Sequence, residues 1–289
     1  SEYIFGGDEP SSVVTTGFAA GGFDLATGGD WDKDAEGVIF KASGDTNLTL
    51  GGGKNYDGTT SVTASGALSA DLSKLVSGYG LFENTETYKV DFLMMGSANY
   101  EKESAQALAN KLIAVADVRK DALAFISPYR KAFITDTAAG SVTVNSDETI
   151  TDNVLEFYSP ITSSSYAVFD SGYKYMYDRF NNQFRFIPTN GDIAGLMVRT
   201  EIDQFPWYSP AGQQRGVLNN AIKLAYNPNK AQRDSLYEAR VNSIVTLPGT
   251  GTVLYGDRTG LNFASAFDRI NVRRLFLTVE KALEGLANE

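Results

Sequence analysis

The feature that most constrains the fold is a short apolar run, a long amphipathic segment and a second apolar run in direct succession. Residues 90–95 (VDFLMM) and 122–126 (ALAFI) are almost wholly apolar, as is typical of central parallel strands with both faces covered. Between them, residues 101–119 carry apolar side chains at the spacing of one helix face. Strand, helix, strand is a βαβ unit, for which a right-handed crossover is the default. The sequence therefore predicts an α/β domain.

Further strands and helices extend this unit along the chain. Strands are predicted at 166–169, 173–177, 183–187, 244–247 and 253–255, and helices at 69–79, 190–202, 213–224 and 229–241. A loop rich in Ser, Thr and Asp is predicted near 135–147, followed by a short helix before Pro160. The predicted fold class is a layered α/β/α domain with a mixed, largely parallel sheet.

We expect one domain over residues 1–289, organised in three stretches. An irregular Gly-rich segment with an edge strand covers 1–45, the α/β core covers 46–256, and a C-terminal helix occupies 257–289. The chain lacks an initiator Met and a signal-peptide pattern. We interpret it as a fragment of a longer protein.

The last helix is predicted from about Ser265 to Leu283, with Ser265 as its cap. One apolar stripe follows the i, i+3, i+4, i+7 rule and is expected to be buried in the domain core; it consists of Val272, Leu275, Phe276, Val279 and Leu283. Ile270 and Leu277 fall nearly opposite that stripe. A helix that is apolar on two sides is usually covered on two sides, either by its own domain or by something outside the chain.

Composition excludes several classes of function. The chain has no Cys and no His, which removes thiolate nucleophiles, disulfides and the commonest general base and zinc ligand. Its 25 basic and 35 acidic residues give a net charge of −10, which disfavours binding to a phosphate backbone. No run of 18 apolar residues occurs, so no membrane span is predicted.

Three local motifs partly match known binding sites, and each departs from the pattern that binding requires. Asp30, Asp32 and Asp34 have the spacing that opens a calcium loop, but Ala35 and Lys41 replace its Gly and Glu; we interpret the segment as a solvated acidic loop. The Gly-Lys pair at 53–54 lacks the rest of a phosphate loop. The Gly-Thr-Gly at 249–251 precedes a strand instead of following one, so it is a turn. We assign no catalytic, cofactor-binding or metal-binding residue.

Several stretches, in this order, resemble the contractile tail sheath proteins of T4-like bacteriophages, members of the phage tail sheath family. They are SYAVFDSGYKYMYDRFN (165–181), IPTNGDIAGLMVRTE (187–201), WYSPAGQQRG (207–216), KAQRDSLYEA (230–239), VLYGDRTG (253–260) and FDRINVRRLF (267–276). Weaker similarity runs through SEYIF, LTLGGG, VDFLMMG and VADVRKDALAFISP. The resemblance covers nearly the whole chain.

The resemblance implies a subtilisin-like topology without a protease triad, which agrees with the absence of the imidazole that such a triad needs. It implies a structural subunit of the virion, made in the host cytoplasm and assembled as stacked hexameric rings around the tail tube. The sheath contracts to drive the tube through the host envelope. Implied partners are other copies, the tail tube protein, and baseplate and tail terminator proteins; no cofactor, nucleic acid or membrane is implied.

Family members also carry outer variable domains before this region and a C-terminal segment after it, with arms that link neighbouring subunits. We expect those parts to be missing here and the chain alone to be mainly monomeric in dilute solution. The candidate interface residues are Ile270, Arg273, Arg274 and Leu277. The alternative for the two arginines is that each serves a local carboxylate, and the alternative for Leu277 is that this domain already covers it.

Two alternative functions belong to other classes. One is a hydrolase on a related α/β fold, which the missing His and Cys and the missing G-x-S-x-G elbow argue against. The other is a glycan- or receptor-binding module that uses the alternating tyrosines Tyr173, Tyr175 and Tyr177; such residues are more often core or interface. We therefore predict a non-enzymatic sheath subunit.

Overall fold

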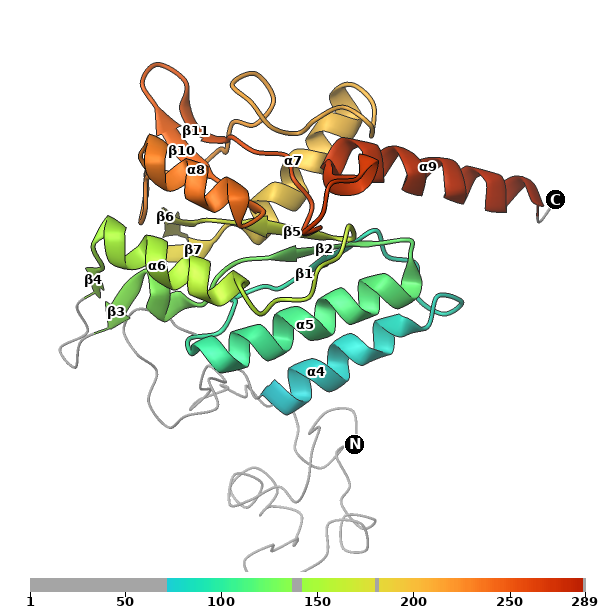
Figure 1. The fold of residues 1–289 in the computed structure, drawn as a ribbon, viewed down its shortest axis with the longest axis horizontal. Helices are drawn as coiled ribbons and strands as arrows, with labels where there is room; N and C mark the ends of the chain where they lie inside the picture. The colour runs from blue at the N-terminus through green and yellow to red at the C-terminus, as the bar shows by residue number, and fades with distance from the viewer. Residues whose placement is uncertain (1–71, 137–141, 180–181, 288–289) are drawn as a thin grey trace, which may run out of the picture. The chain divides into compact units, whose positions relative to one another are not determined.

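The computed structural model describes residues 72–136, 142–179 and 182–287 (Figure 1). Its centre is a parallel sheet in the order β1 (Phe92–Met94), β2 (Leu123–Ile126), β5 (Ala167–Asp170) and β9 (Val241–Asn242). Helix α5 (Lys102–Arg119) connects β1 to β2. The predicted βαβ unit is therefore confirmed.

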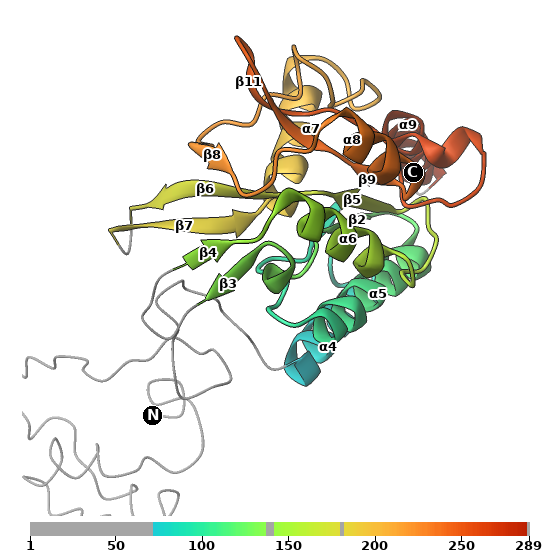
Figure 2. The same cartoon turned by 60° about the vertical axis from the view of Figure 1, so that its left-hand side comes forward.

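The sheet is covered on both faces because successive residues of its strands point to opposite sides. Ala124, Ile126 and Phe169 pack into a cluster with α4 (Leu72–Gly80), α5, α6 (Asp147–Tyr158) and α8 (Lys230–Glu238). Leu123, Phe125 and Val168 pack into a second cluster with α7 (Asn190–Asp203) and α9 (Ile270–Ala287). Figures 1 and 2 show α4 and α5 on one side of the sheet and α7 and α9 on the other. The predicted layered α/β class is confirmed.

In the part of the chain that the structure describes, three small antiparallel sheets lie around this centre. They are the hairpin of β3 (Ile134–Asp136) and β4 (Val142–Val144), the sheet of β6 (Tyr173–Asp178), β7 (Gln183–Pro188) and β8 (Lys223–Leu224), and the hairpin of β10 (Ile244–Leu247) and β11 (Gly251–Leu254). Short 3₁₀ turns lie at η5 (Leu81–Glu83), η6 (Arg130–Ala132) and η7 (Ala266–Asp268). The β6–β7 hairpin extends away from the sheet on the side opposite the free end of α9 (Figures 1 and 2).

The helix predicted at 213–224 is wrong. Only residues 216–218 of this segment pair with β11: Val217 bridges Val253, and the Leu218 amide donates to the Thr252 carbonyl oxygen at 2.8 Å. Gly216 makes the close approach possible, since a Cβ there would lie 2.7 Å from the Leu254 carbonyl oxygen. Backbone pairing with β11 thus overrides the weak helical periodicity of this stretch.

Two other boundaries differ from the sequence prediction. The stretch predicted as a loop near 135–147 contains the β3–β4 hairpin, although residues 137–141 lie outside the described part. Ser265 caps the turn η7, where its hydroxyl accepts a hydrogen bond from the Phe267 amide at 3.2 Å, and α9 begins only at Ile270.

Predictions for residues 1–71 lie outside the described residues; they include the segment 1–45, its edge strand and the three aspartates at 30, 32 and 34. The predicted single domain over 1–289 therefore stays a prediction. Of the helices that the structure does describe, none has the length and apolar character that crossing a membrane requires.

Candidate assembly surface

The inward face of α9 is built from two apolar and two cationic side chains. Ile270 and Leu277 are buried in the cluster that holds Phe125 and Val168 from the sheet. The two arginines beside them, described next, are also buried. All four predicted interface residues are therefore packed within this chain, and their contact with a neighbouring subunit stays a prediction.

Arg273 is held by aromatic rings and hydroxyls. Its guanidinium carbon lies 4.3 Å from the centroid of the Tyr166 ring and 3.9 Å from that of Phe267, an arrangement stabilised by the negative ring faces. It also donates to the Ser165 hydroxyl at 2.6 Å. Burial lowers the pKa of this guanidinium, against the opposing effect of Tyr166 and two carboxylates.

Arg274 ties α9 to the last turn of α7. Its Nη2 donates to Glu201 Oε2 at 2.6 Å, and the guanidinium carbon lies 5.2 Å from the centroid of the Phe92 ring. This arginine thus serves a local carboxylate, which was the alternative to an interface role. Through these contacts the two arginines help to fix the rotation of α9 about its axis.

The predicted burial of the apolar stripe of α9 is wrong. With the arginines facing inward, the opposite side of the helix faces solvent: Leu275, Phe276, Val279 and Leu283 of the predicted stripe are exposed, whereas Val272 is half-buried. Leu286, one turn further on, is exposed as well. Phe276 keeps one edge-on contact with the Phe267 ring, at a centroid distance of 4.8 Å. Hydrophobic periodicity identified the stripe correctly but could not tell which side of the helix the domain covers.

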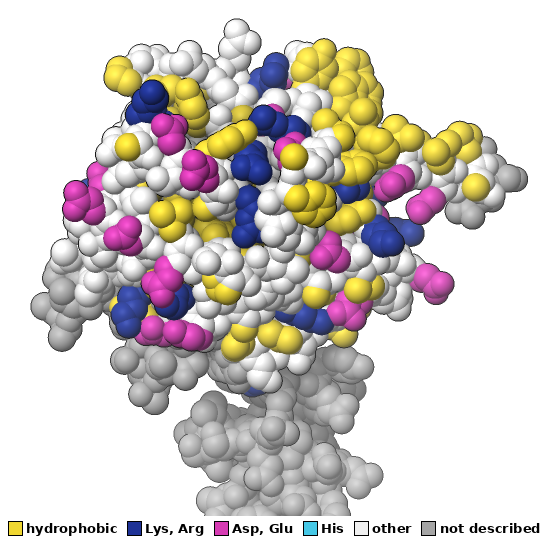
Figure 3. Space-filling model, viewed as in Figure 1, with side chains coloured by type: hydrophobic (Ala, Val, Ile, Leu, Met, Phe, Trp, Pro, Cys, Tyr) yellow, Lys and Arg dark blue, Asp and Glu magenta, His cyan; other side chains and the backbone are white. Residues whose placement is uncertain are grey.

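A second exposed apolar group follows α7. The rings of Phe205 and Trp207 stack at a centroid distance of 5.0 Å with an interplanar angle of 3°, and Tyr208 stacks on Phe205 from 6.1 Å. All three are exposed. Figure 3 shows hydrophobic side chains gathered over the end of α7 and along α9 to its tip. Exposed apolar side chains that gather in one region are typical of a surface that contacts another protein segment.

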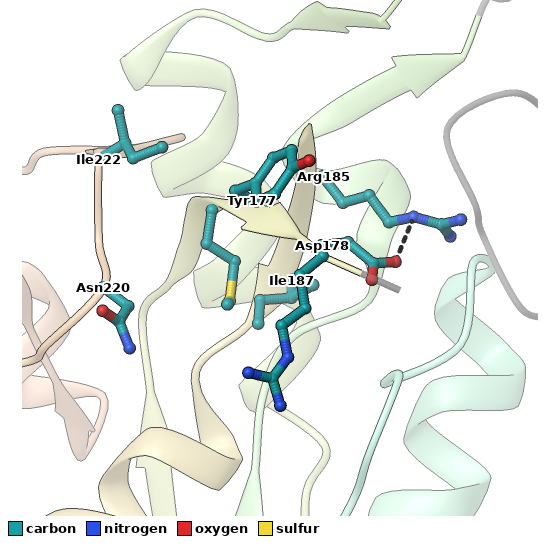
Figure 4. A pocket seen from close by; sticks show the side chains of 8 residues that line it. Tyr177, Asp178, Arg185, Ile187, Asn220 and Ile222 are labelled. Atoms are coloured by element: carbon teal, nitrogen blue, oxygen red, sulfur yellow. Dashed lines mark ion pairs between the residues drawn. The ribbon is translucent and has the colours of Figure 1, made fainter. Parts of the chain in front are cut away.

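An open hollow of about 680 Å³ lies on the β6–β7–β8 sheet. Figure 4 shows Tyr177, Ile187 and Ile222 around it, beside the ion pair between Arg185 Nε and Asp178 Oδ2 at 3.1 Å. The neighbouring tyrosines of β6 do not form a row of exposed rings that could bind a glycan or receptor. Tyr173 is fully buried and its hydroxyl donates to the Pro128 carbonyl oxygen at 3.0 Å, whereas Tyr175 stacks on Phe184.

Ligands of open α/β sheets usually bind beyond the carboxyl ends of the parallel strands, and here that position is filled by protein. Ser127 and Asp170, which follow or end β2 and β5, meet through a hydrogen bond of 2.6 Å from the serine hydroxyl to the carboxyl. Thr189 donates to the same carboxyl at 3.0 Å, and the Asn190 amide donates to Ser127 Oγ at 3.1 Å. These four residues are buried. The usual ligand position is therefore a closed hydrogen-bonded junction between the sheet and α7.

Asp170 gives this junction a predicted pH dependence. Burial raises the pKa of its carboxyl from 3.8 to about 7, against hydrogen bonds from Ser127, Gly172 and Thr189; the nearby Asp192, paired with Lys174, raises it further. Between about pH 4 and 7 the folded protein keeps a proton that the unfolded chain has lost, so its stability falls as pH rises through this window. Denaturant unfolding at pH 5 and pH 8 should show a decrease of about 2–4 kcal/mol from this group.

The Asp170→Asn variant isolates that contribution, because an amide does not titrate. The variant should lose less stability than the wild type between the two pH values. Equal losses in both proteins would show that Asp170 has an ordinary pKa in the fold.

Comparison with known families identifies the family of this chain. A family model described as the central domain of phage tail sheath proteins matches residues 69–260. The chain belongs to the phage tail sheath family. The match covers the whole central sheet, the hydrogen-bonded junction and the aromatic group after α7, and it ends before α9. The family resemblance found in the sequence is confirmed.

Individual relatives extend the similarity beyond residues 69–260. The tail sheath protein of Vibrio phage KVP40 is 33% identical over 278 residues, which are 90% of this chain and 40% of that protein. The tail sheath protein of Enterobacteria phage T4 is 36% identical over 275 residues, 90% of this chain and 37% of that protein. The chain thus spans about two fifths of the length of these curated relatives.

Solved structures with the same fold come from contractile assemblies. The anti-feeding prophage baseplate contains a chain with a TM-score of 0.53 and 19% identity, covering 74% of this chain and 49% of that one. The contracted helical sheath of the same particle gives a TM-score of 0.52 and 18% identity, over 74% and 51% of the two chains. At these identities the likeness establishes the fold alone.

Proposed function

We propose that this chain is the core of a structural subunit of a bacteriophage contractile tail sheath. The observation that carries the proposal is the 36% identity to the T4 tail sheath protein over 275 residues. The closed junction at the sheet edge supports it, because a buried, internally satisfied set of polar groups leaves no room for a substrate at that edge. The comparisons give no support to the alternative of a hydrolase on a subtilisin-like fold.

Contraction requires one subunit with two packings in the assembly that differ in free energy and are separated by a barrier. The two-sided burial of the sheet and the tight junction at Asp170 suit a body that moves as a unit. Contraction then changes only the contacts made by the surface of this domain, where the exposed apolar side chains of α7 and α9 lie. In this account the energy released on triggering is stored between subunits and not inside this domain.

We further propose that the subunit forms stacked rings around a tail tube in the virion, meets the baseplate at one end and a terminator protein at the other, and is assembled in the host cytoplasm. These partners follow from the family relationship. The sheath and baseplate origin of the solved neighbours supports the association of subunits with one another and with a baseplate.

Electron microscopy of the purified product of the gene that encodes this chain tests the proposal. We expect hollow tubes or stacked rings with a helical repeat, and no turnover of peptide, ester or glycoside substrates. Particles that stay single at all concentrations, together with turnover that is lost on changing one Ser or Asp, would replace the structural function with an enzymatic one.

A further inference from the structure

The apolar stripe on the solvent-facing side of α9 has the residue spacing of a coiled-coil interface; the row of side chains along which two such helices meet is called the seam below. Its members, Val272, Phe276, Val279, Leu283 and Leu286, are separated by four, three, four and three residues. This alternation is that of the a and d positions of a heptad repeat, over two heptads, and apolar a and d positions pack as knobs into the holes of a facing helix. Leu275 and Ala282 widen the stripe at the adjoining g positions.

The end of α9 has little support from its own domain. All residues from Ala282 to Ala287 are exposed, and the nearest tie to the body is the ion pair of Lys281 with Asp91. Figure 1 shows this part of the helix projecting beyond the rest of the described fold. A helix gains most of its stability from packing of its apolar face, so this end lacks the contact for which its sequence is patterned.

Charge argues against a second α9 as the occupant. In an antiparallel pair of two α9 stripes centred on Val279, the two Glu280 side chains would meet across the seam, and like charges there are unfavourable. In a parallel pair, each Glu280 would face Leu275 of the other helix and would gain no basic partner. Glu280 is exposed and borders the stripe at an e position. A helix with Lys or Arg opposite Glu280 complements both the apolar seam and the charge.

From this spacing, exposure and charge we infer that the outward face of α9 is the docking site of a separate amphipathic helix, one that lies outside residues 1–289 and carries heptad-spaced apolar residues flanked by basic ones. Val272 to Leu286 form one side of the seam, and Glu280 selects the charge of the partner. The inference concerns this surface only and holds whether or not the chain is part of a sheath.

Two designed peptides of about three heptads test the site. Both carry Leu or Ile at a and d; one has Lys at e and g and the other Glu. Fluorescence anisotropy with the whole 1–289 chain should show binding of the Lys peptide that is at least about tenfold tighter than that of the Glu peptide. Glu280→Lys should reverse this preference, and Leu283→Glu should weaken binding of the Lys peptide at least about tenfold.

Val118→Glu is the matched control, since Val118 is 66% exposed against 59% for Leu283 but lies on α5, on the other side of the sheet. This variant should bind both peptides as the wild type does. Absent binding, equal binding of the two peptides, or binding unaffected by Leu283→Glu would overturn the inference. Light scattering covers the rival occupant: a dimer of the chain that Leu283→Glu dissociates would assign the face to a second copy. A negative result in these peptide-binding experiments would not affect the proposed sheath function, which tube formation by the gene product tests separately.

Discussion

Replacing Leu277 with Glu is expected to lower the free energy of unfolding by about 3–5 kcal/mol, because a buried carboxylate without a cationic partner is among the most damaging single changes. Leu277 is 8% exposed and packs in the cluster with Phe125 and Val168 beneath the sheet. The inward face also contains two cations, Arg273 and Arg274, which already donate to Ser165 and Glu201, although Arg273 Nε and Arg274 Nη1 have no hydrogen-bond partner among the described residues. A new carboxylate would therefore compete for partners that hold α9 in place.

Leu283→Glu is the control, because it makes the same change on the same helix at a side chain that is 59% exposed. It should change the free energy of unfolding of the isolated chain by less than about 0.5 kcal/mol. Urea unfolding followed by circular dichroism measures both variants. Should Leu283→Glu be the more damaging of the two, the orientation of α9 described here would be reversed.

Phe169→Ala is expected to cost about 3–5 kcal/mol, the usual range for removing a large buried aromatic side chain. Phe169 lies on the central strand β5 with no exposed surface, stacks on Tyr158 at a centroid distance of 4.7 Å, and has the Arg240 guanidinium carbon 5.3 Å from its ring centroid. The strand cannot move in to fill the gap, since β2 and β9 pair with it on both sides.

The companion variant Phe263→Ala removes the same side chain from a position that is 61% exposed. It should alter the unfolding free energy by less than about 1 kcal/mol. Thermal melting of both variants at one pH is sufficient. A small loss for Phe169→Ala would mean that the two-sided burial of β5 contributes less to stability than its packing indicates.

The central sheet could be predicted from the sequence because each of its features is local. The two apolar runs at 90–95 and 122–126 are short and bounded, and the helix between them has a clear period, so strand, helix and crossover followed directly. The prediction of a helix at 213–224 is wrong because the conformation of this segment depends on pairing with β11, some 35 residues away along the chain. It also depends on the space that Gly216 leaves for that strand.

The orientation of α9 could not be predicted for a similar reason. Its sequence contains an apolar stripe and a mixed face, and burial of the apolar stripe is the ordinary outcome. The deciding partners are Tyr166 and Phe267 for Arg273, and Glu201 for Arg274. Those contacts join segments that are distant in sequence, and only the fold brings them together. The adjacent arginines on an otherwise moderately apolar face were the one available signal.

Gold labelling of virions tests the central claim, that this chain is the core of a contractile sheath subunit, most directly. Antibodies against the 1–289 chain would be applied to phage particles that carry its gene, with tails in the extended and in the contracted state. We predict label along the whole tail shaft before contraction and over a shorter, wider sheath afterwards, with the inner tube left unlabelled where it emerges. Label confined to the head, the fibres or the exposed tube would contradict the claim.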